Sequence, residues 1–339
     1  MKRRADASNP VKPGLPKLVV GAAAAAAVAL AVGAAPAAAF EPDKAECIAP
    51  ANPGGGWDTI CRTTSAVLQK THAVKTTMYV TNQPGGSGAV AIASVIAKRK
   101  GDPGLLVAAS NSLTFTMAMG RTPHGYDDVI PLAQIAAEYG GFFVRADSKY
   151  KTLGDLVAAL KADPAAVTFA GGSAPGSLDH IKVALLAKAI GVEPAKIVYV
   201  PFQGGGEAIT ALLGGHTVAA TIDLAEAAAQ VEAGKIRCLA LMSDKRSTRF
   251  KDLPTTYEQG VKVTFPIWRG LYMAPGAPAE AVKFWSDAVK KMVATPEWSA
   301  EREKLAWEPT QRFGDEFKQF VKEEHARYQT LLKELGFLK

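Results

Sequence analysis

Short apolar runs alternate with longer amphipathic segments along most of the chain. The short runs predict strands at residues 46–50, 77–82, 105–109, 142–145, 167–170, 197–201, 217–222 and 236–242. The longer segments repeat their apolar positions every three to four residues and predict helices at residues 57–70, 87–98, 152–161, 177–189, 206–213, 225–233, 278–294 and 315–335. This alternation is typical of an α/β protein with largely parallel sheets.

Two stretches interrupt the alternation and predict that the chain crosses between two lobes. Residues 145–150 are polar and separate an apolar strand from a new helix, and residues 264–270 precede a region that is helical to its end. Crossings at both points divide the chain into a lobe made of residues 40–147 and 266–339 and a second lobe made of residues 148–265.

Residues 1–39 have the pattern of a secretory signal peptide. A cationic start is followed by an apolar run over residues 18–35 and by three alanines before Phe40, which predicts cleavage after Ala39 and a mature chain outside the cytoplasmic membrane. An uncleaved membrane anchor is the alternative, although the run is short and consists mostly of Ala and Gly. Arg3 and Arg4 lack the apolar residues that follow a twin-arginine signal, and the export route stays open.

The composition excludes a disordered, collagen-like or disulfide-framework protein, because 48% of the 339 residues are hydrophobic and only three are cysteines. The formal charge of +7 falls to +3 without the predicted leader, so it gives no argument for a nucleic-acid partner. Among the cysteines, Cys47 and Cys61 are the nearest pair for a disulfide, and three buried thiols, Cys238 included, are the alternative.

One device occurs four times: an apolar strand, a glycine-rich turn and an apolar helix. The turns fall at residues 50–58, 83–88, 171–177 and 201–207. Each lies at the carboxyl end of a predicted strand, where open α/β sheets bind their ligands. Glycine leaves main-chain N–H groups uncovered, and the start of the following helix adds a partial positive charge. The four turns therefore favour the binding of an anion.

Motifs for catalysis, metal or cofactor binding are weak. No phosphate-binding P-loop and no nucleophile elbow occurs, and the five histidines lack metal-ligand spacing. Residues 86–91 fit a lone dinucleotide-binding fingerprint, which leaves a periplasmic nicotinamide-dependent oxidoreductase as a remote alternative. We expect neither catalysis nor a cofactor nor a metal.

Several side chains near the turns have two readings. Asp58 and Arg62 are spaced for an ion pair along one helix, and Asp58 is equally a candidate ligand contact. Trp57 directly follows three glycines and is well placed to wall a pocket. Trp268 and Arg269 are expected either to line a cleft or to pack a hinge. Asp223 and Glu226 are expected to cap a helix or to orient other groups, because carboxylates are poor direct partners for an anion.

The motifs together closely resemble the periplasmic substrate-binding proteins of tripartite tricarboxylate transporters, the Bug or TctC family. The resemblance covers the whole mature chain, looks closest to the citrate-binding TctC branch, and rests on five motifs: Glu46-Cys47-Ile48-Ala49-Pro50-Ala51, Gly54-Gly55-Gly56-Trp57-Asp58, Pro84-Gly85-Gly86-Ser87-Gly88-Ala89, Gly204-Gly205-Gly206-Glu207 and Ile267-Trp268-Arg269-Gly270.

The resemblance implies a hinged, two-lobed fold of the type II periplasmic binding protein kind, a Venus flytrap, without catalysis. It also implies a ligand site made of Asn52, Pro53, Gly54, Gly55, Gly56, Trp57, Asp58, Pro84, Gly85, Gly86, Ser87, Ser173, Ser177, Phe202, Gln203, Gly204, Gly205, Gly206, Glu207 and Asp223. Phe202 lacks the hydroxyl that a Tyr provides in other members, and the residue at Trp57 varies with the ligand.

The function implied is the capture of a small di- or tricarboxylate by a monomer in the periplasm, with citrate or tricarballylate as first candidates. The ligand is handed to a permease made of a large and a small integral membrane subunit, and no nucleic acid takes part. A C4–C6 or aromatic dicarboxylate is an alternative ligand, and an extracytoplasmic sensor subunit is an alternative role.

Overall fold

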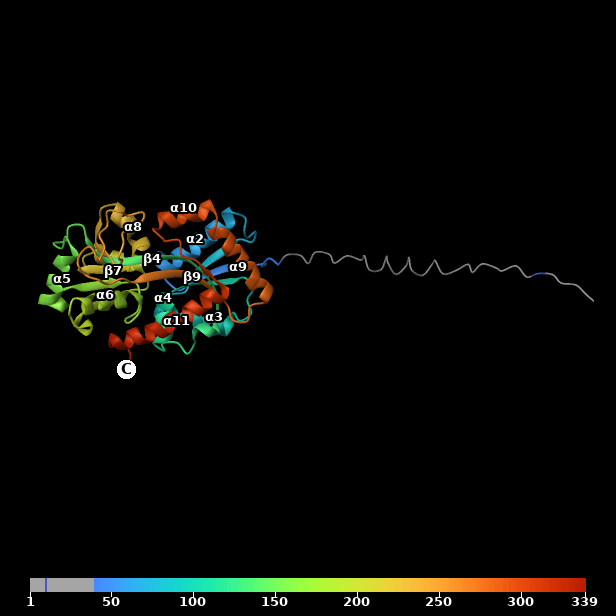
Figure 1. Cartoon of the computed structure of the whole chain (residues 1–339), viewed down its shortest axis with the longest axis horizontal. Coiled ribbons are helices and arrows are strands. Elements are labelled where there is room, and N and C mark those ends of the chain that lie inside the picture. Colours follow the sequence, from blue (N-terminus) through green and yellow to red (C-terminus); the bar gives the residue numbers. More distant parts are fainter. Residues whose placement is uncertain (1–9, 11–39) are drawn as a thin grey trace, which may run out of the picture. The chain divides into compact units, whose positions relative to one another are not determined.

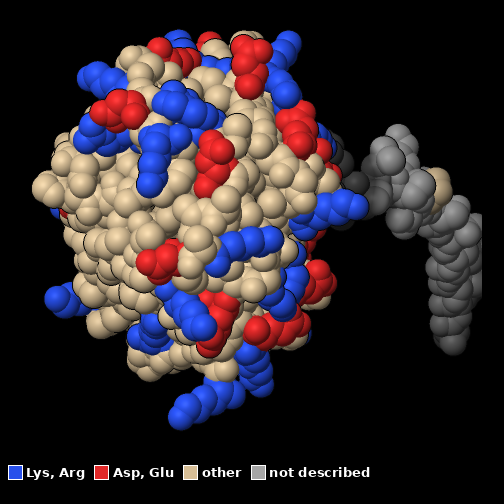
Figure 2. Space-filling model, turned by 90° about the vertical axis from the view of Figure 1, so that its left-hand side faces the viewer, with Lys and Arg blue, Asp and Glu red and all other residues tan. Residues whose placement is uncertain are grey.

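The computed structural model describes residue 10 and residues 40–339, and the rest of the predicted signal peptide lies outside these residues (Figure 1). Within the described part of the chain, no helix has the length and apolar character needed to cross a membrane. On the face seen in Figure 2, cationic and anionic side chains are interspersed and do not form a region of one sign.

Ten strands and ten α-helices make up residues 40–339. The strands are β1 (Ala45–Ala49), β2 (Met78–Asn82), β3 (Leu105–Ser110), β4 (Ile130–Arg145), β5 (Thr168–Gly171), β6 (Val198–Pro201), β7 (Ala219–Asp223), β8 (Ile236–Leu241), β9 (Pro266–Met273) and β10 (Arg312–Phe313). The helices are α2 (Gly56–Lys70), α3 (Ala89–Lys98), α4 (Asn111–Ala118), α5 (Leu153–Ala162), α6 (Leu178–Ala189), α7 (Gly205–Leu213), α8 (Leu224–Glu232), α9 (Ala279–Val293), α10 (Pro296–Lys304) and α11 (Gly314–Glu334).

Every strand and helix expected from the sequence is present, but four elements and most of β4 were not predicted. The helix α4 follows β3 without a loop, and all of its residues are buried, so it lacks the amphipathic pattern that marks a helix. Residues 264–270, expected to be a joint, contain the start of the buried strand β9. The strand expected at 142–145 is the end of the 16-residue strand β4.

The expectation of largely parallel sheets is wrong. The strands form one ten-stranded mixed sheet in the order β2-β1-β3-β9-β4-β7-β5-β6, with β8 and β10 also paired to β4. The strands β1, β2 and β3 are parallel, as are β5, β6 and β7, but β4 and β9 run antiparallel to their neighbours. Local hydrophobic patterns do not carry this pairing, because it joins segments far apart in the sequence.

The strand β4 connects the two groups of parallel strands. Its residues 130–139 pair with β9, whereas Gly140 and the residues after it pair with β7 and β8. In Figure 1, β4 and β9 pass through the middle, with α5, α6 and α8 on one side and α2, α3 and α9 on the other. The point at which β4 stops pairing with β9 and begins to pair with β7 and β8 requires glycine. A Cβ atom on Gly141 would lie 2.8 Å from the backbone oxygen of Ala240.

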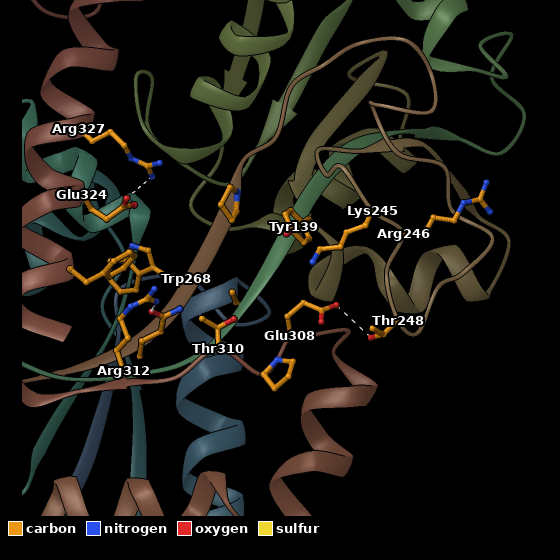
Figure 3. A pocket seen from close by; sticks show the side chains of 15 residues that line it. Tyr139, Lys245, Arg246, Thr248, Trp268, Glu308, Thr310, Arg312, Glu324 and Arg327 are labelled. Carbon is orange, nitrogen blue, oxygen red and sulfur yellow. Dashed lines mark hydrogen bonds and ion pairs between the residues drawn. The ribbon is translucent and has the colours of Figure 1, made fainter. Parts of the chain in front are cut away.

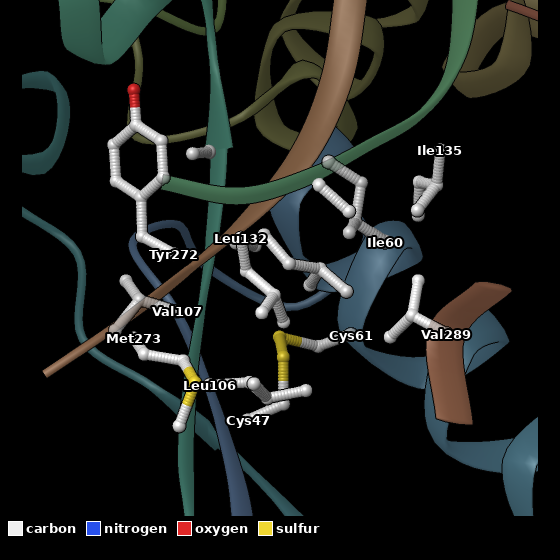
Figure 4. Packing of buried hydrophobic residues seen from close by; sticks show 14 of the residues in the cluster. Cys47, Ile60, Cys61, Leu106, Val107, Leu132, Ile135, Tyr272, Met273 and Val289 are labelled. Carbon is white, nitrogen blue, oxygen red and sulfur yellow. A yellow bond between two sulfur atoms is a disulfide. The ribbon is translucent and has the colours of Figure 1, made fainter. Parts of the chain in front are cut away.

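The core around β1 contains a disulfide between Cys47 and Cys61, which joins β1 to α2 (Figure 4). The bridge packs against Leu106, Ile60 and other apolar side chains of one large buried cluster. Cys238 is a free, buried thiol, and burial raises its pKa. The structure therefore selects the paired alternative for the first two cysteines and the buried thiol for the third.

Candidate functional site

The glycine-rich turns lie where the sequence predicts them, at the carboxyl ends of β1, β2, β5 and β6. Because β1, β2 and β3 are parallel, their ends share one edge, and the same holds for β5, β6 and β7. Gly54 and Gly88 have φ values of +82° and +92°, which strain any other residue. Glycine is thus needed at these turns for the path of the chain.

The turns after β1 and β6 pack backbone against backbone. The N–H of Asn52 donates to the carbonyl oxygen of Gln203 at 3.0 Å, and the side-chain amide of Asn52 donates to Glu207. A Cβ atom on Gly55 would lie 3.4 Å from the Cα atom of Gly204. The two turns are therefore within van der Waals contact of each other at Gly55 and Gly204.

The turns after β2 and β5 also touch each other. The Ser87 hydroxyl accepts a hydrogen bond from the N–H of Ala174 at 2.7 Å. Ser177 lies 2.9 Å from the hydroxyl of Ser112, which belongs to α4. Strand ends from the two parallel groups therefore meet in two pairs of contacts.

A small cavity, here called the strand-end cavity, lies between these strand ends. It is lined by Ala51, Gly56, Trp57, Ser110, Ser112, Gly172, Ser173, Leu178, Asp179, Gly204, Asp223, Glu226 and Arg269. Its volume is 30 Å³. Ligand pockets in proteins are usually about 300–1,000 Å³, so the strand ends must separate before a small organic molecule can enter.

Uncharged donors line the strand-end cavity. Within residues 40–339, the N–H groups of Gly56, Gly172 and Gly204 make no backbone or side-chain hydrogen bond. In the same part of the chain, the indole Nε1 of Trp57 is buried without a partner. Unpaired buried donors are costly, and an incoming acceptor removes that cost. The cavity is therefore chemically suited to an anion held by main-chain and indole N–H groups.

Asp58 does not line the strand-end cavity, because its oxygens hold the turn and the helix. It accepts hydrogen bonds from Arg62 at 2.8 Å, from the N–H of Gly54 at 3.0 Å and from the amide of Asn82 at 2.9 Å. Burial alone would raise the pKa of Asp58, but these three hydrogen bonds outweigh it and lower the pKa. The i,i+4 ion pair read from the sequence is present.

A buried charge cluster forms the inner wall of the cavity. The Arg269 guanidinium binds Glu138 at 2.6 Å and Asp223 at 2.5 Å. Lys182 lies 2.7 Å from both Asp223 and Asp179. Both cations are paired with carboxylates, Arg269 through its Nε and Nη2 atoms. Burial alone would lower the pKa values of Lys182 and Arg269, but the neighbouring carboxylates outweigh it and raise both above their usual range.

The acids of this cluster outnumber its cations. Burial raises the pKa of Glu226 to about 8, with further increases from the charges of Asp223 and Asp179. Burial also raises the pKa of Asp179 and of Glu138, whereas Lys182 and Arg269 overcome burial and lower the pKa of Asp223. A protonated Glu226 at neutral pH relieves repulsion within the cluster.

The residues expected at the site are divided between the cavity, its contacts and the surface. Gly56, Trp57, Ser173, Gly204 and Asp223 line the cavity. Asn52, Gly55, Ser87, Ser177, Gly205 and Glu207 hold the turns together. Pro53, Gly54, Gly86 and Gln203 are exposed, Phe202 packs on a hydrophobic cluster, and Asp58, Pro84, Gly85 and Gly206 are not among the lining residues.

Sequence reasoning missed several lining residues. Ser110 is the last residue of β3 and Ser112 lies in the first turn of α4, where polar residues directly follow an apolar strand but no glycine marks a turn. Asp179 follows the third turn, and its burial has no local signal. Lys182 and Glu138 complete the ion pairs and belong to elements that only the folded sheet brings together.

Comparisons with known proteins give a consistent result. A sequence profile described as tripartite tricarboxylate transporter family receptor matches residues 61–337. A UPF0065 protein from the gbd 5′ region of Cupriavidus necator is 31% identical over 214 residues. The match covers 62% of this chain and 63% of that protein, so the chain spans less than two thirds of the length of this relative. A UPF0065 protein of Bordetella pertussis is 24% identical over 291 residues, 85% of this chain and 88% of that protein.

Solved structures share the fold. The periplasmic binding protein BugD has a TM-score of 0.80 at 20% identity, covering 87% of this chain and 98% of its own. MatC from Rhodopseudomonas palustris, solved with malate, has a TM-score of 0.76 at 21% identity, with coverage of 85% and 98%. An R. palustris protein solved with adipate has a TM-score of 0.79 at 24% identity, with coverage of 86% and 97%. The chain thus has a mixed α/β periplasmic binding protein fold.

Proposed function

The chain belongs to the tripartite tricarboxylate transporter receptor family, whose members are binding proteins and not enzymes, and we propose that it captures a small di- or tricarboxylate in the periplasm. The observation that carries this proposal is that Gly56, Gly172 and Gly204 line one cavity from different strand ends and that their N–H groups have no hydrogen-bond partner within residues 40–339. Such donors are fixed before the ligand arrives, which limits the cost of ordering them.

The number of donors is adequate for a useful affinity. A hydrogen bond to a charged group contributes about 1.5–3 kcal/mol, and micromolar binding needs about 8 kcal/mol net. Six residues of the lining carry uncharged donors: Gly56, Gly172 and Gly204 have main-chain N–H groups, Trp57 has an indole N–H, and Ser110 and Ser112 have hydroxyls. These donors therefore suffice for a carboxylate after the costs of association are deducted.

Capture requires the strand ends to separate, and we propose that two lobes move apart to allow it. Residues 40–147 and 266–339 form the first lobe and residues 148–265 the second. The support is that β1, β2 and β3 lie on one side of the β4–β9 pair and β5, β6 and β7 on the other. The ligand then joins the two sets of turns and favours the closed state.

Citrate and tricarballylate are the first ligand candidates, and a C4–C6 dicarboxylate is the second. The second is favoured because three carboxyl groups, those of Asp179, Asp223 and Glu226, line the cavity with a single cation, Arg269. A third ligand carboxylate would approach the charge of Asp223. The fold relatives solved with malate and adipate carry ligands of this smaller class.

Titration calorimetry on residues 40–339 tests the proposal with citrate, tricarballylate, malate, adipate and an aromatic dicarboxylate, and with trimethyl citrate as an uncharged control. We expect saturable binding of at least one carboxylate and none of the triester. Equal binding of the triester, or no binding of any carboxylate, contradicts the proposal. Delivery to a permease of a large and a small membrane subunit predicts that deletion of the gene abolishes uptake of the same carboxylate.

A further inference from the structure

Glu226 is the acid of the buried charge cluster that makes no ion pair within residues 40–339. The ion pairs of the cluster join its other members: Arg269 with Glu138 and with Asp223, and Lys182 with Asp179 and with Asp223. Both cations are therefore already shared among three acids. A fourth carboxylate in the same place would meet like charge, and the neutral, protonated form of Glu226 avoids that repulsion.

The two oxygens of Glu226 accept hydrogen bonds from the main chain. Oε1 accepts from the N–H of Gly205 and Oε2 from the N–H of Asp223, both at 3.3 Å. Both partners are donors, so neither can receive the proton of a carboxylic acid. Within the described residues, the protonated Glu226 thus has an O–H group without an acceptor, and an incoming anion removes the cost of leaving it unpaired.

Glu226 is also the most accessible acid of the cavity wall. It lines the strand-end cavity and is partly exposed, whereas Asp179 and Asp223 are 4% and 3% exposed. Gly172 and Gly204 line the same cavity. A ligand carboxylate that is held by these two main-chain N–H groups is therefore a neighbour of the Glu226 carboxyl group.

The charged groups that face Glu226 all belong to the cluster. Of the elements packed against α8, α7 contributes Glu207, which accepts hydrogen bonds from Asn52 and Gln203. The strand β8 contributes Arg237, which donates to two backbone carbonyl oxygens. Together, burial and the charges of the cluster place the pKa of Glu226 at about 8, with burial as the largest cause.

We propose that the protonated Glu226 donates a hydrogen bond to a carboxylate of the ligand, and that capture is therefore coupled to one proton. This inference rests on the proposed function and adds a contact to it. Where Glu226 is ionised, it takes a proton from the solvent when the ligand binds and returns it when the ligand leaves. An acid that is a poor partner for an anion in its charged form thus becomes a donor in its neutral form.

The affinity for malate and for adipate between about pH 7 and pH 9 tests the coupling. Both probes are fully ionised in this range, so a change of affinity arises in the protein. With a pKa of about 8, only about one tenth of the Glu226 groups are protonated at pH 9. The dissociation constant is therefore expected to rise about tenfold from pH 7 to pH 9.

Two variants of α8 assign this pH dependence to Glu226. Glu226→Gln keeps a donor that does not titrate, and its dissociation constant is expected to change by less than about twofold over the same range. Glu232→Gln is the matched control, because it makes the same substitution at the exposed end of α8, where Glu232 pairs with Arg249. It is expected to keep the tenfold change.

Calorimetry in buffers with different enthalpies of ionisation counts the protons and needs no variant. In the wild type, we expect uptake of about half a proton per ligand at pH 8 and close to none at about pH 6.5. An affinity that is independent of pH, no proton uptake at pH 8, or a tenfold change that persists in Glu226→Gln overturns the inference, while binding of either dicarboxylate still supports the proposed function. If neither malate nor adipate binds at pH 7, the inference is overturned, and the proposed function fails with it only if no other carboxylate of the calorimetry panel binds.

Discussion

Trp268 and Arg269 are consecutive residues of β9, yet their side chains line different cavities on opposite faces of the sheet. Alternation along a strand explains this, since successive side chains point to opposite faces. The same holds on β4, where Glu138 binds Arg269 while Tyr139 lines a cavity of 460 Å³ on the other face (Figure 3). Two adjacent strands thus line both cavities.

The close approach of the turns predicts a strong effect at Gly55. A Cβ atom there would lie 3.0 Å from that of Ala51 and 3.4 Å from the Cα atom of Gly204. Gly55→Val prevents the turns from closing on a ligand and is expected to weaken carboxylate binding by about tenfold or more in calorimetry. Gly125→Val is the matched control, because its Cβ atom meets nothing within 4 Å. Unchanged affinity in Gly55→Val would show that the turns do not close on the ligand.

The buried cluster predicts that Arg269 is needed for stability. In Arg269→Met, Glu138 and Asp223 lose a cation inside the protein, and the free energy of unfolding is expected to fall by about 3–5 kcal/mol. Urea unfolding followed by circular dichroism measures the change. Arg145→Gln, which breaks an exposed ion pair with Asp147, is expected to change stability little. Similar free energies of unfolding for the two variants would show that the buried Arg269 ion pairs do not stabilise the fold.

The raised pKa of Glu226 predicts a dependence of stability on pH. Its pKa is about 8 in the folded chain against an ordinary 4.5, so the folded state holds the proton more tightly. The stabilisation is complete below pH 4.5 and is lost as the pH rises to about 8, by at most about 1.4 kcal/mol per pH unit. Urea midpoints between these pH values measure the loss.

In Glu226→Gln, the fall in the free energy of unfolding between pH 4.5 and about 8 is expected to be smaller than in the wild type. Asp179 and Glu138, whose pKa values are also raised, still titrate in the same direction. Asp223, Lys182 and Arg269 surround these acids and keep their charge throughout. An identical pH profile for the variant would mean that Glu226 is ionised in the folded chain at neutral pH.

The disulfide predicts a response to reduction. Cys47 and Cys61 are 14 residues apart, and a loop of this size is stabilised by about 3 kcal/mol when it is closed. A reducing agent, or Cys47→Ser with Cys61→Ser, is expected to lower the free energy of unfolding by this amount. Cys238→Ala keeps the bridge and should respond to the reducing agent as the wild type does. No response in either protein would show that the bridge is absent in solution.

Features that depend on neighbouring residues were predictable from the sequence. The glycine-rich turns follow strands because apolar runs and glycines adjoin in the chain, and the Asp58–Arg62 pair needs only a helix. These signals placed the turns after β1, β2, β5 and β6 correctly. They also singled out Gly56 and Gly204, which line the strand-end cavity.

Features that depend on the pairing of strands were not predictable from the sequence. Arg269, Glu138 and Asp223 are separated by many residues and meet only because β9 and β7 pair with β4. Pro131 interrupts the apolar pattern at the start of β4, which conceals the strand. Two cavities on opposite faces likewise require the register of β4 and β9, and no local pattern encodes it.

The unbroken path of β4 constrains how the chain can deform. One continuous strand is hydrogen-bonded to β9 along its first part and to β7 and β8 along its last. Any parting of the turns therefore has to be absorbed as torsion near Gly140 and Gly141, because a swinging loop is not available there. A twist at that point would turn Glu138 and Tyr139 together, because both directly precede Gly140 in the same strand.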